Sequence, residues 1–189
     1  MWAMKVLALC LVVVLAACGG KKNSADSKAI DAYVNQDLAP QLAKVVAARA
    51  AYGNVREVDI DEQPEKMRYL FRDVAAPFLK QAVQGASVLT PPPAAKELHE
   101  DTLRLWKRES DIISVMAAAT DPVDPAKFKE GHAQMMALQE SVIRYDGKLQ
   151  ALLDANGGLK LAPLPEVKIP EVKLDEPAPA PVDPTAPSP

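Results

Sequence analysis

Apolar residues recur at steps of three and four between residues 26 and 157, which is the pattern of amphipathic helices. The first such stretch is Asp26–Tyr52. Its apolar stripe ends on a basic residue, and its members are Ile30, Val34, Leu38, Leu42, Val45 and Arg49. Pro40 lies inside this stretch, and an interior proline removes a helix hydrogen bond and clashes with the preceding turn. We therefore expect a kink near Gln36 or a break into two helices.

Two further helices follow the same logic. The second is expected from Pro64, in the position of a first-turn proline, to about Gly85, with Pro77 predicting a second kink. The third opens at Thr90, whose hydroxyl can cap the helix and which precedes three prolines. Its apolar face repeats every seven residues, at Leu98, Leu105, Ile112 and Ala119.

The fourth helix has the clearest limits. Asp124 is the expected N-cap, Pro125 fits the first turn, and Asn156-Gly157-Gly158 predicts a left-handed stop. Its heptad positions are Phe128, Met135, Val142 and Leu149. Four such helices joined by short loops predict an all-α fold. We expect an antiparallel up-down four-helix bundle with kinked helices over residues 26–157. Both ends of such a domain lie at one pole.

The N-terminus has the pattern of an export signal. Lys5 precedes the apolar run Val6–Ala17, which spans about 18 Å as a helix and is short of the ~30 Å bilayer core. The residues Leu15-Ala16-Ala17-Cys18 resemble the lipobox of bacterial lipoproteins. The resemblance implies that residues 1–17 are a cleaved signal peptide and that Cys18 carries two or three acyl chains such as palmitate. An ordinary signal peptide or a buried N-terminal helix is the alternative.

The resemblance also implies a location. Gly19 and Gly20 follow the cysteine, where an aspartate often marks retention in the inner membrane. We therefore expect a lipid anchor in the outer membrane, facing the periplasm, with a Gram-positive plasma membrane left open. Residues 18–25 form the tether, and its last seven residues reach at most ~25 Å, which would hold the helical domain close to the bilayer.

Residues 158–189 change in composition. Nine of the 17 prolines lie between Pro163 and Pro189, and the sequence Pro165–Ile169 is repeated with one change as Pro170–Leu174. Charged, proline-punctuated sequence favours polyproline II and cannot bury a core, so we expect a disordered Pro-rich tail. The alternative is a spacer or docking segment directed to peptidoglycan or another envelope protein.

Composition and cysteine content exclude several classes of function. The chain has a net charge of −3, which argues against nucleic acid as a partner. Cys10 and Cys18 are its two cysteines, so after cleavage and acylation neither a disulfide nor a thiolate metal site remains. No sequence motif of a nucleophilic enzyme or a phosphate-binding loop occurs. We expect neither an enzyme nor a bound cofactor.

The histidines are the remaining candidates for metal chemistry. His99 and His132 are the two histidines. His99 is followed by Glu100, but Leu103 stands where the metalloprotease motif needs a second histidine. Neither histidine has the glutamate three residues before it that a di-iron bundle uses. His132 with Met135 and Met136 could ligate Cu(I) or haem, whereas methionines at helical spacing are mostly core residues. The acidic run Glu57–Glu62 indicates a solvated loop rather than a calcium site.

Two hypotheses of function follow. The first is a membrane-anchored envelope lipoprotein that acts as a non-enzymatic helical interaction or structural module. It predicts an exposed apolar or acidic groove that meets another envelope protein. The second is a small-ligand or metal carrier, for copper or haem, that uses the bundle interior near His132 and Met135.

Overall fold

The computed structural model describes residues 25–53, 55–56 and 59–169. Within these ranges the regular structure is helical, and the single β-type contact is an isolated bridge between Thr120 and Val123. The expectation of an all-α fold is confirmed. Residues 1–17, which are expected to be a signal peptide, lie outside the described residues, as do Cys18 and the second copy of the proline-punctuated repeat.

The first long helix is continuous from Ala25 to Tyr52 and consists of α1 (Ala25–Ala32), the π-helical segment η1 (Tyr33–Leu38) and α2 (Ala39–Tyr52). The amide of Ala39 donates to the carbonyl oxygen of Val34, five residues back, which is the π pattern. The wider turn accommodates Pro40, which has no amide proton to donate. Gln36 lies within η1, so the disturbance was placed correctly, and it is a π segment rather than a break.

The second long helix repeats this arrangement. After the short helix α3 (Asp59–Glu62), which replaces the expected loop, come α4 (Pro64–Arg68), the π segment η2 (Tyr69–Ala75) and α5 (Ala76–Ser87). The amide of Ala76 donates to the carbonyl oxygen of Phe71, again five residues back. Each π segment ends two residues before a proline, η1 before Pro40 and η2 before Pro77. The amide proton that proline lacks therefore explains both π segments.

The third and fourth helices are regular. A 3-10 turn, η3 (Pro93–Ala95), leads into α6 (Lys96–Ala118), and α7 runs over Pro125–Ala155. Asp124 caps α7 as expected, because its carboxylate accepts the amide of Lys127 at 3.1 Å. The expectation that Thr90 caps the third helix is wrong, since the helical turn begins at Pro93 and receives no side-chain cap.

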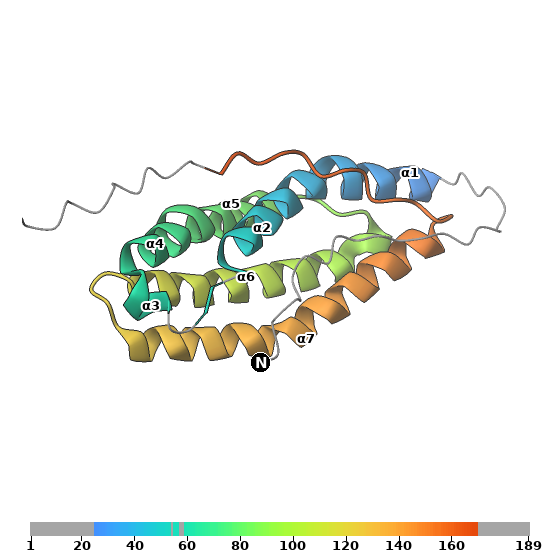
Figure 1. The fold of residues 1–189 in the computed structure, drawn as a ribbon. Helices are drawn as coiled ribbons and strands as arrows, with labels where there is room; N and C mark the ends of the chain where they lie inside the picture. The colour runs from blue at the N-terminus through green and yellow to red at the C-terminus, as the bar shows by residue number, and fades with distance from the viewer. Residues whose placement is uncertain (1–24, 54, 57–58, 170–189) are drawn as a thin grey trace, which may run out of the picture.

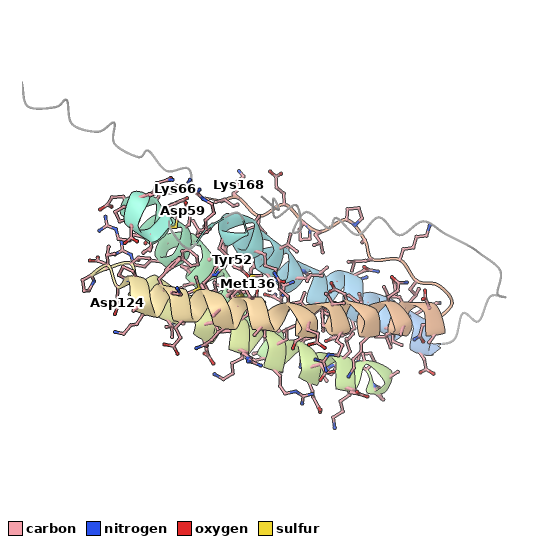
Figure 2. All side chains as sticks on the ribbon, turned by 60° about the horizontal axis from the view of Figure 1, so that its bottom comes forward. Tyr52, Asp59, Lys66, Asp124, Met136 and Lys168 are labelled. Atoms are coloured by element: carbon pink, nitrogen blue, oxygen red, sulfur yellow. The ribbon has the colours of Figure 1, made fainter. Side chains whose placement is uncertain are left out.

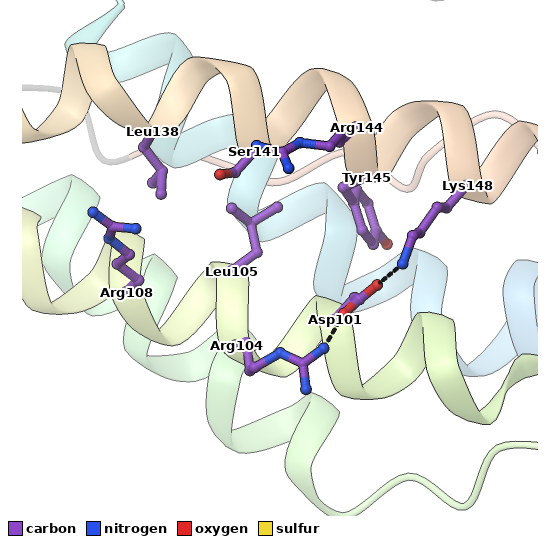
Figure 3. A pocket seen from close by; sticks show the side chains of 9 residues that line it. All are labelled: Asp101, Arg104, Leu105, Arg108, Leu138, Ser141, Arg144, Tyr145 and Lys148. Carbon is purple, nitrogen blue, oxygen red and sulfur yellow. Dashed lines mark hydrogen bonds and ion pairs between the residues drawn. The ribbon is translucent and has the colours of Figure 1, made fainter.

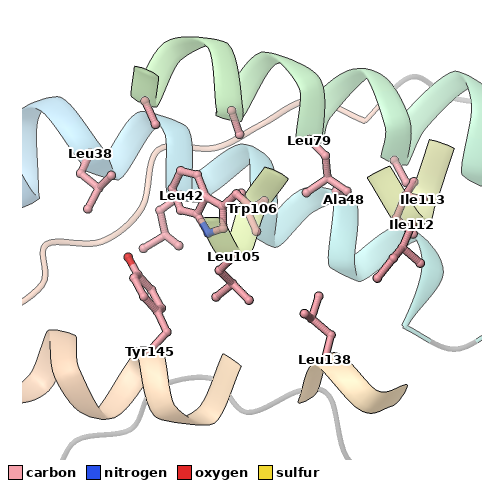
Figure 4. Packing of buried hydrophobic residues seen from close by; sticks show 14 of the residues in the cluster. Leu38, Leu42, Ala48, Leu79, Leu105, Trp106, Ile112, Ile113, Leu138 and Tyr145 are labelled. Atoms are coloured by element: carbon pink, nitrogen blue, oxygen red, sulfur yellow. The ribbon is translucent and has the colours of Figure 1, made fainter. Parts of the chain in front are cut away.

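The long helices pack lengthwise around one core, with α6 in contact with both α5 and α7 (Figure 1). Trp106 of α6 is fully buried in this core, which also contains Leu42 and Leu79 (Figure 4). The heptad positions of the third helix are all buried. In α7, Phe128 and Leu149 are buried, whereas the intervening Met135 and Val142 are half-buried.

Residues 159–169, here called the C-terminal strap, return from the end of α7 along α1 to α2 (Figure 1). Gly157 and Gly158, with φ of 93° and 69°, reverse the chain in a conformation that favours glycine. Leu159, Leu161 and Leu164 then pack against the core. The packed part of the protein therefore extends beyond the boundary expected at residue 157.

Candidate functional site

A groove of about 290 Å³ lies between α6 and α7 (Figure 3). It is called the α6–α7 groove below, and its lining residues are Asp101, Arg104, Leu105, Arg108, Leu138, Ser141, Arg144, Tyr145 and Lys148. The successive contributions from α6 are three, one and three residues apart, so they share one face of that helix. The successive contributions from α7 are three, three, one and three residues apart, so they also share one face. The groove is therefore a direct product of the pairing of two long helices.

The groove has an apolar floor and a charged rim. Leu105, Leu138 and Tyr145 are buried, and the hydroxyl of Tyr145 lies 3.2 Å from the hydroxyl of Thr102, which donates to it. Burial raises the pKa of Tyr145 to about 12, so this phenol stays protonated at neutral pH. The rim bears four cationic side chains and one carboxylate.

The one lining carboxylate is shared between two cations. Lys148 donates to Asp101 at 2.5 Å, and Arg104 donates to the other oxygen of the same carboxylate. The hydrogen bond from Lys148, with help from Arg104, lowers the pKa of Asp101 and keeps it charged. Lys148 also reaches Glu97 at 2.9 Å, just outside the groove, and its own pKa is raised by these two carboxylates.

The other two cations are less engaged. Arg144 faces Glu140 at 3.6 Å through an exposed pair, which contributes little to stability. Within the described ranges Arg108 makes no ion pair, and no dashed line joins it to another of the lining side chains drawn in Figure 3. Positive charge thus remains available on the rim of a chain whose net charge is −3.

This arrangement suits the recognition of an anion. Guanidinium groups present donors in a planar fork that matches carboxylate or phosphate oxygens. An open groove with an apolar floor can at the same time accept an aliphatic or aromatic side chain. The sequence-based hypothesis of an interaction module expected an apolar or acidic groove. The floor of this groove is apolar, but its rim is basic rather than acidic, because Arg104 and Arg108 of α6 lie opposite Arg144 and Lys148 of α7.

A second polar cluster lies inside the protein. Arg49 of α2 donates to both carboxylate oxygens of Glu109 of α6, at 2.9 and 2.7 Å, and Tyr52 donates to the same carboxylate. Burial alone would lower the pKa of Arg49, but Glu109 more than offsets it, so Arg49 stays charged. Burial, followed by the charge of Glu109, raises the pKa of Tyr52. Because each group of this cluster is satisfied by the others, we assign it a structural role.

His99 is held in another internal contact. The hydroxyl of Tyr33 lies 2.9 Å from Nδ1 of His99, and both side chains are buried. Burial lowers the pKa of His99, against a smaller opposing effect of Glu100, so the imidazole is neutral at neutral pH. The contact joins the first long helix to the start of α6 and occupies one of the two ring nitrogens that a metal could use.

His99 does not lie close to the other residues considered for a metal site. His132 and Met135 of α7 are half-buried. Met136, which is labelled in Figure 2, lies on the same helix and is exposed. Gly131 of α7 packs on Met116, and residues 99 and 116 are separated by about 25 Å along α6. His99 and His132 therefore lie at different levels of the molecule. Within the described ranges, no cluster of three or more His, Cys, Asp or Glu side chains could hold a metal ion.

Sequence reasoning missed Glu109 and the basic face of α6. Glu109 was detectable in principle, because it lies four residues after Leu105 on the stripe that leads to Ile112. A charged residue at a position where the helical repeat expects an apolar one indicates a side chain that is buried together with a partner. The groove had a weaker signal, since it depends on which face of α7 meets α6.

Among the described helices, none has the length and apolar character needed to cross a membrane. Comparison with protein-family models, with curated proteins and with solved structures found no match to this chain.

Proposed function

We propose that this protein is a lipid-anchored envelope lipoprotein whose helical domain acts as a non-enzymatic interaction module. Its α6–α7 groove binds a carboxylate-rich surface, on another envelope protein or on peptidoglycan. The observation that supports this role is the convergence of four cations on an open groove in an acidic chain. Charge of this kind attracts an acidic partner and fixes its orientation.

The anchor in this proposal rests on Leu15-Ala16-Ala17-Cys18. One acyl chain gives reversible membrane binding, whereas two or more give stable attachment. An acylated Cys18 at the outer membrane would place the helical domain in the periplasm. Carboxylates of envelope proteins and of the peptide stems of peptidoglycan are available in that compartment.

We also propose that the four long helices form an antiparallel up-down bundle. The start of α1 and the end of α7 lie at the same end of the molecule in Figure 1, which supports this topology. The short tether would then hold that pole near the bilayer. Asp101 lies near the start of α6 and Lys148 near the end of α7, so these two residues form the end of the groove that is closest to that pole.

The proposal is tested by binding to two carboxylate probes, isolated peptidoglycan sacculi and a short polyglutamate peptide. The full mature chain is compared with a charge-reversed variant, Arg108→Glu with Arg144→Glu. The matched control is Lys80→Glu, an exposed lysine on α5 outside the groove. We expect binding to at least one probe that weakens with salt and falls at least tenfold in the groove variant.

The two probes separate the two sources of carboxylate. Binding to sacculi but not to polyglutamate indicates peptidoglycan, and the reverse indicates an acidic protein segment. Absence of binding to both probes at micromolar concentration would contradict the proposal. So would an equal loss of binding in the Lys80→Glu control.

A further inference from the structure

The exposure pattern of the C-terminal strap matches one face of a polyproline II helix. Leu161, Leu164 and Val167 are half-buried, and the residues between them are mostly exposed. Polyproline II has three residues per turn, so these positions lie on one side. Pro163 and Pro165 favour the same conformation. The strap therefore contacts the helices with one row of apolar side chains.

Asn35 binds the backbone of the strap directly. Its Nδ2 donates to the carbonyl oxygen of Lys160 at 3.0 Å, and its Oδ1 accepts the amide of Ala162 at 2.7 Å. These two bonds use the donor and the acceptor of one side-chain amide on the backbone of one extended segment. Backbone contacts of this kind fix the path of a peptide without selecting its side chains.

Asp31 fixes the orientation of this amide. Nδ2 of Asn35 also donates to Oδ1 of Asp31 at 2.8 Å, one helical turn earlier. The nitrogen of the amide therefore faces the two oxygen acceptors, on Asp31 and Lys160, and its oxygen faces the amide of Ala162. The orientation of the Asn35 amide is thus supported by a residue of the first long helix as well as by the strap.

The backbone around Asn35 is unusual as well. Asn35 lies in η1, the π segment that precedes Pro40. Such segments are often found at functional sites, because the extra residue changes the direction of nearby side chains. The amide that binds the strap is therefore presented by the irregular part of an otherwise regular helix.

We propose that the face of α1 and η1 around Asn35 is a peptide-recognition site for polyproline II segments with an apolar residue at every third position. The strap occupies it in cis. The ligand in trans is a proline-containing segment of a partner protein, which binds when the strap leaves. Recognition of a preformed polyproline II chain costs little conformational entropy, which suits a shallow site. This inference is independent of the α6–α7 groove and of the anchor.

The experiment has to account for competition between the strap and a free peptide for the same site. A segment tethered through Gly157 and Gly158 acts at an effective concentration near the millimolar range, so the wild-type protein resists a free peptide. We release the strap in the full chain with Leu161→Ser and Leu164→Ser. The probe is a fluorescent synthetic peptide with the sequence of residues 158–169, and binding is followed by anisotropy.

The strap-released variant is expected to bind the peptide at least tenfold more tightly than the wild type. Adding Asn35→Ala to the released variant should weaken binding about tenfold, since two hydrogen bonds are lost. Gln36→Ala is the matched control, because Gln36 is the exposed neighbour of Asn35, and it should leave the affinity unchanged. No binding by a folded released variant, or indifference to Asn35→Ala, would overturn the proposal.

A second measurement does not depend on the released variant folding. Hydrogen exchange of the Ala162 amide should be slowed in the wild type and accelerated by Asn35→Ala, with Gln36→Ala as control. Unchanged exchange at Ala162 would overturn the proposed clamp. A wild-type dimer that exchanges straps and is lost in Asn35→Ala would assign the face to a second copy of the chain and overturn the partner-peptide proposal.

Discussion

Arg49 and Glu109 join α2 to α6 through a two-pronged ion pair, with nitrogen–oxygen distances of 2.9 and 2.7 Å. Glu109 is 1% exposed, and its carboxylate also accepts the hydroxyl of Tyr52. A carboxylate buried to this degree is tolerated because three donors compensate for its lost hydration. The pair therefore fixes the register of the first and third long helices at one level of the core.

Removal of the acidic partner should be strongly destabilising. Glu109→Ala leaves the Arg49 guanidinium mostly buried without its counter-charge and opens a cavity. We expect a loss of about 3–5 kcal/mol in the free energy of unfolding, measured with urea. The control is Asp111→Ala, which breaks an exposed pair with Lys107 and should change stability by less than about 1 kcal/mol. Equal effects of the two variants would contradict a structural role for the cluster.

The stability should depend on pH through His99. Burial lowers its pKa below the ordinary value of 6.5. As the pH falls below 6.5, the unfolded chain takes up this proton before the folded protein does, so the free energy of unfolding decreases. His99→Gln should remove this part of the decrease between pH 6.5 and 5.5. An unchanged pH dependence in His99→Gln would refute the assignment.

Alanine substitutions at two glycines of α7 should change the free energy of unfolding in opposite directions. A Cβ on Gly131 would clash with Cγ of Met116, and a Cβ on Gly147 would meet nothing within 4 Å. Gly147→Ala is expected to raise the free energy of unfolding by about 0.5–1 kcal/mol, through helix propensity. Gly131→Ala should lower it by about 1–2 kcal/mol, because overpacking exceeds that gain. Stabilisation by both substitutions would show that α6 and α7 are less closely packed at this level.

The lipid anchor can be tested on the intact chain in cells. Labelling with a radioactive fatty acid should mark the protein, and Cys18→Ala should lose the label because the acyl acceptor is gone. Cys10→Ala, a change within the expected signal peptide, is the matched control and should keep the label. A labelled Cys18→Ala protein would show that the lipobox interpretation is wrong.

The helix limits were largely predictable because they depend on local chemistry. Asp124 and Pro125 mark the start of α7, and Gly157 marks the reversal at its end. Pro40 and Pro77 located the two irregular turns. The sequence could not show that a π segment would absorb each proline, because that choice depends on whether packing keeps the two halves of the helix collinear.

The interior polar contacts and the strap were harder to predict, because they join residues far apart in the chain. Asn35 and Ala162, or Tyr33 and His99, have no local signal of their pairing. The residues after Gly158 have the composition of a disordered segment, and Leu159, Leu161 and Leu164 find an apolar surface only once the helices are assembled. The groove likewise depends on the relative rotation of α6 and α7.

The most direct test of the proposed function is site-specific photo-crosslinking in living cells. A photoreactive amino acid at Ser141, within the groove, should give a discrete adduct with an envelope component. That adduct should disappear in the Arg108→Glu, Arg144→Glu variant. The same amino acid at Ser87, exposed at the end of α5, should not give it. Absence of an adduct at Ser141, or the same adduct from both positions, would contradict the account of an anchored module that binds through its α6–α7 groove.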